Sequence, residues 1–369
     1  MRQINFVGTF PTDHSGYGNH TRGLVNAFYD LYNKEFKIGW ECGRPQNWEV
    51  LVSGEEKLML DNTNNGVQVM VTMPHIMPLK ASDHPKRLLQ YCVFEGDKIP
   101  KFWAEHLNDE RVSRVLVPSK HVFDACTNTG VLKDKLRIVP HGINTRIFSQ
   151  EIKSVVPKHD KFTFLFCGGW AQGNRDRKDL PLLLRAFCEE FSPKEPVRLL
   201  VKINNAYQHP NFDYNAAIHQ FVPASHAELV INSETVKTET MPLLYAQADV
   251  FCCISKGEAF GLTFLEALGC GLPCISGKWG GTNDFLNDDN SWLITPDRFE
   301  QATDNNLLYE GIKWAEYCVN DVRKALRTAF ANRDEVIRKS ANASQCAQNF
   351  SWMHSAEILK QVIDEVDKE

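Results

Sequence analysis

Two glutamates separated by seven residues stand out in residues 255–281, which read SKGEAFGLTFLEALGCGLPCISGKWGG. Glu258 lies in a glycine-flanked turn after the apolar run VFCCI, and Glu266 lies inside an amphipathic run. That run stops at Gly269 and Gly271, a pattern typical of a helix end. The segment therefore predicts a strand, a loop, a helix and a strand, with one carboxylate in the loop and one on the helix.

This arrangement suits a ligand that carries both an anion and hydroxyl groups. In open α/β sheets, ligands bind at the carboxyl ends of strands and against helix N-termini. Glu266 is positioned to accept hydrogen bonds from ribose hydroxyls, and Glu258 to face a sugar. Solvated helix faces also carry glutamates at this spacing, but the added Ala-Phe-Gly-Leu and Gly-Leu-Pro elements favour a binding site. The backbone amides expected to point at the anion belong to Phe260, Gly261, Leu262 and Thr263.

A glycine-containing loop with the sequence HSGYGNH follows the first apolar run, INFVG. Gly16 and Gly18 would let the backbone approach a phosphate at the start of the next helix. A dinucleotide-binding fingerprint is the alternative, with Glu41 as the ribose partner. Against it, Thr21 occupies the place of the third glycine. A flexible surface turn is the remaining interpretation.

Basic residues follow another apolar run, FTFLFCG. Arg175, Arg177 and Lys178 lie between this predicted strand and the helical run PLLLRAF. Cationic side chains at the mouth of a strand suit a diphosphate, because guanidinium and ammonium groups make charge-assisted hydrogen bonds to phosphate oxygens. The alternative is a solvated run of charges.

These segments, together with the Pro-His-Gly-Ile-Asn element at residues 140–144, resemble the retaining glycosyltransferases of family 4. The resemblance covers nearly the whole chain and is strongest over residues 162–285. It implies an α/β protein of the GT-B fold, in which two Rossmann-like, doubly wound domains face each other across a cleft. Short apolar runs that alternate with helical runs agree with parallel sheets.

The resemblance also implies a domain organisation. Residues 1–150 are expected to form an N-terminal acceptor-binding domain and residues 151–350 a C-terminal nucleotide-sugar-binding domain. A helix over residues 351–369 is expected to cross back to the N-terminal domain. We place the linker at residues 151–160, which are polar, and expect helices to follow Asp297.

By the same resemblance, Lys178 and Arg177 hold the donor diphosphate, with Arg175 as the alternative arginine. Glu258 binds the donor sugar as a catalytic residue, and Glu266 binds the ribose. The glycine loop with Gly16 and Gly18 faces the donor diphosphate and the acceptor.

Glu95 is the second predicted catalytic residue, because it ends a predicted strand where an acceptor hydroxyl would lie. A structural role for this carboxylate is the alternative. His14 and His75 are weaker candidates, since a single histidine is more often structural. Because Glu258 is expected to be a cleft-facing loop carboxylate that contributes little packing, Glu258→Ala is expected to leave the fold intact.

The chain contains no Asp-x-Asp pair, which the glycosyltransferases of the other main fold use to hold a metal-bound diphosphate. We therefore expect no metal site and no cofactor apart from a UDP- or GDP-linked nucleotide-sugar co-substrate. If a metal is required, Glu95, Asp97 and Asp284 are the first candidate ligands. Cys270 and Cys274 lack further ligands at a suitable spacing, so zinc is not predicted.

The sequence thus predicts a retaining hexosyl- or pentosyltransferase that moves a sugar from a nucleotide-sugar donor to an acceptor hydroxyl. A saccharide or glycoconjugate is the expected acceptor. One alternative is a hydroxylated base in DNA, since the N-terminal half is slightly basic. The others are a nucleotide-sugar epimerase or phosphorylase of the same fold, and a non-catalytic nucleotide- or carbohydrate-binding protein.

Composition agrees with such an enzyme. A chain of 369 residues usually forms two domains, and its net charge of −5 argues against a dedicated nucleic-acid binder. No signal peptide and no run of eighteen apolar residues is visible, so we expect a cytoplasmic protein without integral membrane association. The eleven scattered cysteines are expected to be free, buried thiols.

Overall fold

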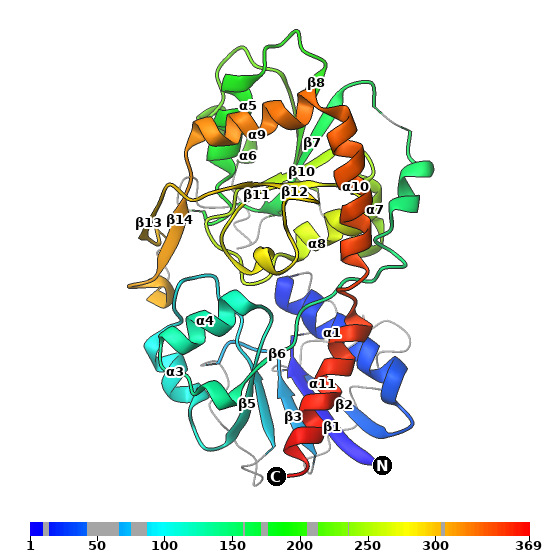
Figure 1. The fold of residues 1–369 in the computed structure, drawn as a ribbon, viewed down its shortest axis with the longest axis vertical. Coiled ribbons are helices and arrows are strands. Elements are labelled where there is room, and N and C mark those ends of the chain that lie inside the picture. The colour runs from blue at the N-terminus through cyan, green and yellow to red at the C-terminus, as the bar shows by residue number, and fades with distance from the viewer. Residues whose placement is uncertain are drawn as a thin grey trace. The chain divides into compact units, whose positions relative to one another are not determined.

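The computed structural model describes residues 1–9, 15–42, 66–74, 87–157, 159–170, 176–204, 213–234, 236–303 and 307–369. These residues divide into two compact units, shown in Figure 1. Unit 1 contains residues 1–144 and 350–369, and unit 2 contains residues 145–349. The chain thus passes from unit 1 to unit 2 after Asn144, whereas the sequence predicts the boundary at residue 150.

Unit 1 is built on a parallel sheet of six described strands, in the order β2-β1-β3-β4-β5-β6. Its strands are β1 (Arg2–Gly8), β2 (Phe36–Cys42), β3 (Val67–Met70), β4 (Leu88–Tyr91), β5 (Val112–Val117) and β6 (Leu136–Ile138). The accompanying helices are α1 (Gly16–Tyr32), α3 (Lys101–Leu107), α4 (Lys120–Asn128), the 3-10 turn η2 (Lys133–Lys135) and α11 (Trp352–Val366).

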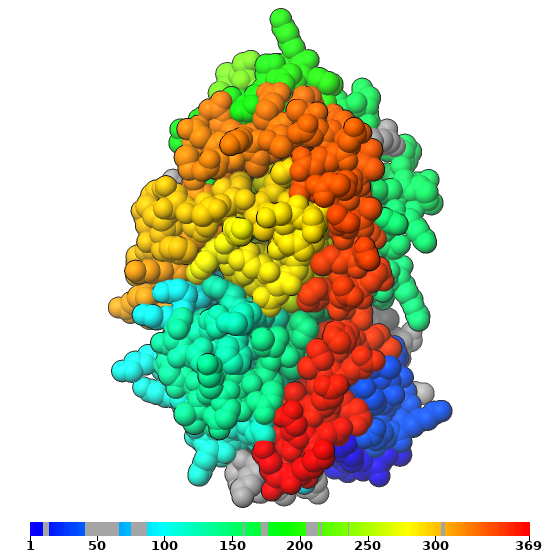
Figure 2. All heavy atoms as spheres, viewed as in Figure 1, coloured from blue at the N-terminus to red at the C-terminus, as the bar shows by residue number. Residues whose placement is uncertain are grey.

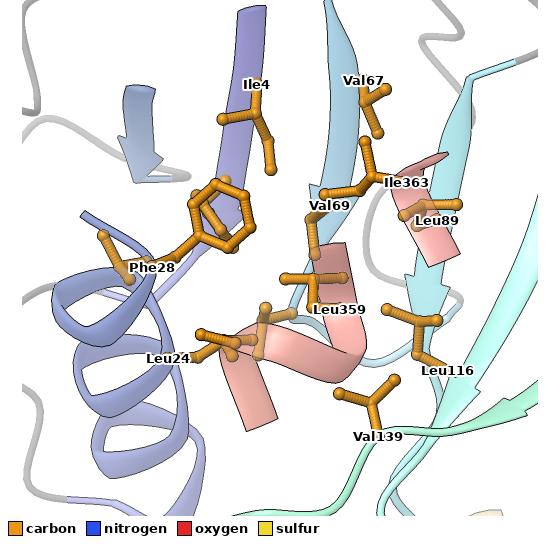
Figure 3. Close-up of a cluster of buried hydrophobic side chains, with 14 of the residues drawn as sticks. Ile4, Leu24, Phe28, Val67, Val69, Leu89, Leu116, Val139, Leu359 and Ile363 are labelled. Atoms are coloured by element: carbon orange, nitrogen blue, oxygen red, sulfur yellow. The ribbon is translucent and has the colours of Figure 1, made fainter. Parts of the chain in front are cut away.

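The C-terminal helix α11 completes the core of unit 1. Its apolar side chains recur at the spacing that forms one face of a helix, and Leu359 and Ile363 lie among the core side chains of unit 1 in Figure 3. Figure 2 shows the red residues of α11 directly beside the blue residues of α1. Each such buried side chain stabilises the unit by about 1.5–3 kcal/mol.

A close backbone approach holds this helix where the chain returns to unit 1. Ile143 forms a parallel bridge with Ser351, and its amide donates to the Phe350 carbonyl at 3.0 Å. A Cβ atom at Gly142 would lie 2.3 Å from the Ser351 carbonyl carbon, so only glycine fits there.

Unit 2 contains a second parallel sheet of six described strands, in the order β12-β11-β10-β7-β8-β9. These strands are β7 (Phe162–Gly169), β8 (Val197–Asn204), β9 (Glu228–Asn232), β10 (Val250–Cys253), β11 (Cys274–Gly277) and β12 (Ser291–Ile294). Both faces of β7 and β10 are buried, as expected for a sheet that is covered by helices on both sides.

The helices of unit 2 flank this sheet in Figure 1. They are α5 (Leu180–Glu190), α6 (Tyr214–His219), α7 (Met241–Tyr245), α8 (Leu262–Gly269), α9 (Val319–Ala331) and α10 (Arg333–Ala347). Short 3-10 turns are η3 (Gln150–Ser154), η5 (Thr238–Thr240), η6 (Gly281–Asp284) and η7 (Leu307–Tyr309). The prediction of two doubly wound parallel sheets is confirmed.

The expectation of helices directly after Asp297 is wrong. A two-stranded antiparallel hairpin, β13 (Arg298–Gln301) and β14 (Lys313–Glu316), precedes α9. The reason is tertiary packing, since Ala315 is fully buried and its amide donates to the Lys256 carbonyl at 3.0 Å. Single-sequence patterns do not reveal such a contact between segments far apart in the chain.

Candidate functional site

The predicted basic segment and Glu258 meet at the switch point of the unit 2 sheet. From β7 the chain continues to β8 and β9 on one side, and then returns to β10 on the other side of β7. Connections that leave neighbouring strands in opposite directions open a crevice at the carboxyl ends of those strands. Arg177 and Lys178 follow β7, and Glu258 follows β10, so all three lie at this crevice.

Glu258 forms ion pairs with both cations. The Lys178 Nζ lies 2.5 Å from the Glu258 Oε1, and the Arg177 Nη1 lies 3.2 Å from the Oε2. Glu258 is only 6% exposed, whereas the two cationic side chains are 16% and 21% exposed. The carboxylate is therefore enclosed behind cations that still reach solvent.

These ion pairs keep Glu258 charged. Burial acts to raise its pKa, but the Lys178 ammonium and the Arg177 guanidinium outweigh burial and hold the pKa of Glu258 below its ordinary value. The expectation that Glu258 contributes little packing is wrong, because its side chain is buried and forms two ion pairs. The sequence could not show this, because the paired residues are about eighty positions apart.

Backbone hydrogen bonds hold the two loops together. The Arg177 carbonyl accepts from the Lys256 amide at 2.8 Å and from the Ser255 hydroxyl at 3.2 Å. On the other side, the Gly281 amide donates to the Glu258 carbonyl at 2.7 Å. Gly280 has a φ of +110°, and a Cβ atom there would lie 3.1 Å from the Glu258 backbone, so this turn requires glycine.

The N-terminus of α8 lies next to this constellation. Gly261 precedes the helix with a φ of +97°, and no side chain caps the first turn. The amides of Leu262 and Thr263 lie in that turn, where helix geometry provides no intrahelical acceptor. The Oγ1 atoms of Thr263 and Thr282 are buried and have no hydrogen-bond partner among the described residues. Amides, helix dipole and hydroxyls together suit an anion.

Glu266 lies one turn further along α8 and is buried as well. Its Oε2 accepts a hydrogen bond from the Tyr245 hydroxyl at 2.8 Å. Burial raises the pKa of Glu266 to about 7, although the hydrogen bond from Tyr245 acts in the opposite direction. Sequence reasoning missed Tyr245, which ends the short helix α7 and shows no motif of its own.

Comparison with known proteins supports the interpretation of this region as a glycosyltransferase site. Residues 161–309, which include both loops and α8, match the family model "Glycosyl transferases group 1". Two solved structures align over the full length of the chain. HepE of Anabaena with UDP-glucose has a TM-score of 0.68 and 14% identity, and covers 100% of both chains. Sucrose-phosphate synthase of Thermosynechococcus elongatus has a TM-score of 0.70 and 15% identity, with the same coverage.

The chain thus has the GT-B fold of these structures, and its residues 161–309 are similar to the group 1 glycosyltransferases. A D-inositol 3-phosphate glycosyltransferase of Kribbella flavida is 25% identical over 246 residues, covering 60% of this chain and 54% of that protein. An uncharacterized glycosyltransferase of Methanocaldococcus jannaschii is 24% identical over 257 residues, covering 66% and 62%. The chain therefore aligns with little more than half the length of these relatives.

The candidate residues of the N-terminal half form a second group, within unit 1. Gly16 and Gly18 lie in the first turn of α1, where the Ser15 Oγ accepts from the Gly18 amide at 3.1 Å. Between them, the Tyr17 hydroxyl donates to the Val93 carbonyl at 3.4 Å. Burial raises the pKa of Tyr17 well above its ordinary value, and the nearby Glu95 charge raises it further. The glycine turn thus lies near Glu95.

Other candidates lie outside the described residues. These are His14, His75, Arg175 and the side chain of Glu41. The choice between Arg175 and Arg177 is therefore untested, although Arg177 is placed at the site.

Among the described residues, no cluster of three His, Cys, Asp or Glu side chains could hold a metal ion. Ten cysteines are described as free, and eight of these are buried, in agreement with the expected thiols. None of the described helices combines the length and apolar character required to cross a membrane.

Replacing Glu258 with alanine should lower the free energy of unfolding by about 1–3 kcal/mol, because both cations lose their shared carboxylate. Glu258→Gln keeps the shape of the side chain and one carbonyl oxygen, so its free energy of unfolding should fall by less. Urea unfolding of both variants measures this difference. Glu300→Ala removes an exposed ion pair with Arg298 on β13 and serves as the control, with a change within about 0.5 kcal/mol. A Glu258→Ala variant as stable as wild type would contradict the described ion pairs.

The stability contributed by Glu266 should depend on pH. Its pKa is raised from 4.5 to about 7 in the folded state, so its contribution is complete below pH 4.5 and is lost as pH rises through 7. Relative to Glu266→Gln, wild type should therefore lose about 3 kcal/mol across that window. Urea unfolding of both proteins from pH 4 to pH 8 tests this, and parallel stability profiles would show that the folded-state pKa is not raised.

Proposed function

We propose that the protein is a retaining glycosyltransferase that transfers a sugar from a nucleoside diphosphate sugar to an acceptor hydroxyl. The observation that carries this proposal is the contact of Lys178 and Arg177 with Glu258, at a strand switch point and beside the N-terminus of α8. Cations that bind phosphate and a carboxylate that binds hydroxyls thus lie within one ion-pair distance. A nucleoside diphosphate sugar carries phosphate groups and sugar hydroxyls close together, so it could contact all three side chains.

In this proposal the diphosphate replaces Glu258 as the partner of Lys178 and Arg177. The amides of Leu262 and Thr263 bind phosphate oxygens, since the positive end of the α8 dipole lies there. Once its ion pairs with Lys178 and Arg177 are broken, Glu258 accepts hydrogen bonds from hydroxyls of the donor sugar. Glu266 accepts hydrogen bonds from the ribose, and its partner Tyr245 fixes the orientation of its carboxyl group.

The same groups would promote sugar transfer. Negative charge develops on the diphosphate as its bond to the sugar breaks, and preorganised cations and amides stabilise this charge without a metal ion. The acceptor hydroxyl attacks from the face of the departing diphosphate, through an oxocarbenium-like state, so that the anomeric configuration is retained. Glu95 binds the acceptor or takes up its proton.

The donor and the acceptor are proposed at the level of chemical class. HepE has been solved with UDP and glucose, and UDP- or GDP-linked hexoses are the first donors to test here. A saccharide or glycoconjugate hydroxyl is the proposed acceptor.

Turnover without a metal ion tests the proposal directly. The protein should release UDP or GDP from one nucleotide sugar in a panel, in the presence of saccharide acceptors and excess EDTA. The coupling constant of the product's anomeric proton should match the configuration of the donor. Release that depends on added Mn²⁺ or Mg²⁺ would contradict metal independence, and an inverted product would contradict retention. No release from any donor that binds would indicate a binding protein.

Replacing Lys178 with methionine should weaken nucleoside diphosphate binding much more than nucleoside binding. A charged hydrogen bond contributes about 1.5–3 kcal/mol, which corresponds to a loss of affinity of roughly 10- to 150-fold. Calorimetry with UDP, GDP and their nucleosides measures this ratio. Lys324→Met removes an exposed lysine of α9 and serves as the matched control. Equal losses for nucleoside and diphosphate would place Lys178 away from the phosphates.

A further inference from the structure

A second buried group of charges is formed by Lys256, Asp179 and Glu316. The Lys256 Nζ is 2.8 Å from the Glu316 Oε1 and 3.7 Å from the Asp179 Oδ2. The side chains of Lys256 and Asp179 are less than a tenth exposed, and that of Glu316 is 18% exposed. None of the three was singled out by sequence motifs, because they come from three separate segments.

Each member of this group adjoins a segment of the site. Asp179 directly follows Lys178, and Lys256 lies two positions before Glu258. Glu316 ends β14, the strand in which the Ala315 amide donates to the Lys256 carbonyl at 3.0 Å. The Lys256 ammonium thus joins the loop after β7, the loop after β10 and the β13–β14 hairpin.

The backbone at Asp179 has an unusual conformation. Asp179 has a φ of +45°, and among the described residues it alone combines a side chain with positive φ. Such a conformation is unfavourable for residues other than glycine, although aspartate and asparagine tolerate it better than most. Asp179 precedes α5 without capping it, and its carboxylate instead faces Lys256.

The charges favour a persistent contact of Lys256 with Glu316, and with Asp179 in its ionised form. Burial acts to lower the pKa of Lys256, but the two carboxylates outweigh burial and raise it, so the ammonium stays charged. Burial raises the pKa of Asp179 to about 7, with Lys256 lowering it and Glu316 raising it. Burial raises the pKa of Tyr317, and the nearby charges of Glu316 and Asp179 raise it further. An unpaired charge at this depth would be strongly unfavourable.

We infer that Lys256 is a positioning residue, which orients Lys178 toward the donor diphosphate by holding Asp179 in its left-handed conformation. Lys178 lies between two anchored residues: backbone hydrogen bonds attach Arg177 to the loop after β10, and Lys256 attaches Asp179 to the same loop. The inference rests on the proposed function. It adds Lys256, which no sequence motif singled out, to the residues that determine donor affinity. Lys256 itself contacts neither phosphate nor sugar.

Donor binding and turnover kinetics of Lys256→Met test this role. The variant should raise the Kd for UDP or GDP, whichever wild type binds, and the donor KM by about 10- to 100-fold, as small misplacements of binding groups do. The acceptor KM should stay unchanged. Lys256→Arg, which keeps the charge, should restore most of the affinity. Lys324→Met is the control for the loss of a lysine.

A second variant keeps the test valid if Lys256→Met does not fold. Asp179→Gly removes the carboxylate but tolerates the positive φ, and it should weaken donor binding in the same direction. If both single variants fold, the double variant Lys256→Met with Asp179→Gly should lose no more donor affinity than Lys256→Met alone. The reason is that both substitutions remove the same contact, between Lys256 and Asp179. Additive losses would overturn the inference, as would wild-type donor affinity in either single variant. If wild type binds neither UDP nor GDP, the proposed function fails together with this inference.

Discussion

The site depends on one buried carboxylate that is shared by two cations. Glu258 is enclosed by protein, and it stays ionised because Lys178 and Arg177 compensate for the loss of hydration. Conversely, the carboxylate keeps the two like charges close together without a ligand. A diphosphate carries more negative charge than one carboxylate. It can therefore replace Glu258 as the partner of Lys178 and Arg177 with little rearrangement of the two cationic side chains.

The backbone around this carboxylate is arranged to bring the three groups together. The order of strands places the ends of β7 and β10 side by side, and hydrogen bonds from Ser255 and Lys256 to the Arg177 carbonyl close the gap between their loops. Gly261 and Gly280, which both follow Glu258 in the chain, adopt positive φ values. These turns need backbone conformations that residues with a side chain rarely adopt. This explains why glycines accompany the charged residues in this segment.

Much of this was predictable from the sequence, because the informative signals are local. Alternating apolar and helical runs predicted two parallel sheets, and the spacing of Glu258 and Glu266 placed one in a loop and one on a helix. The environment of Glu258 was not predictable, since burial and ion pairing come from segments far apart in the chain. The same reason explains why Tyr245, the Lys256 group and the β13–β14 hairpin were missed.

The central claim is that a diphosphate displaces Glu258 from Lys178 and Arg177. A crystal structure with a bound nucleoside diphosphate tests it most directly. The account predicts phosphate oxygens within hydrogen-bond distance of the Lys178 ammonium, the Arg177 guanidinium and the first amides of α8, with the Glu258 carboxylate separated from both cations. A nucleotide bound elsewhere, or one bound while both ion pairs of Glu258 stay intact, would contradict it.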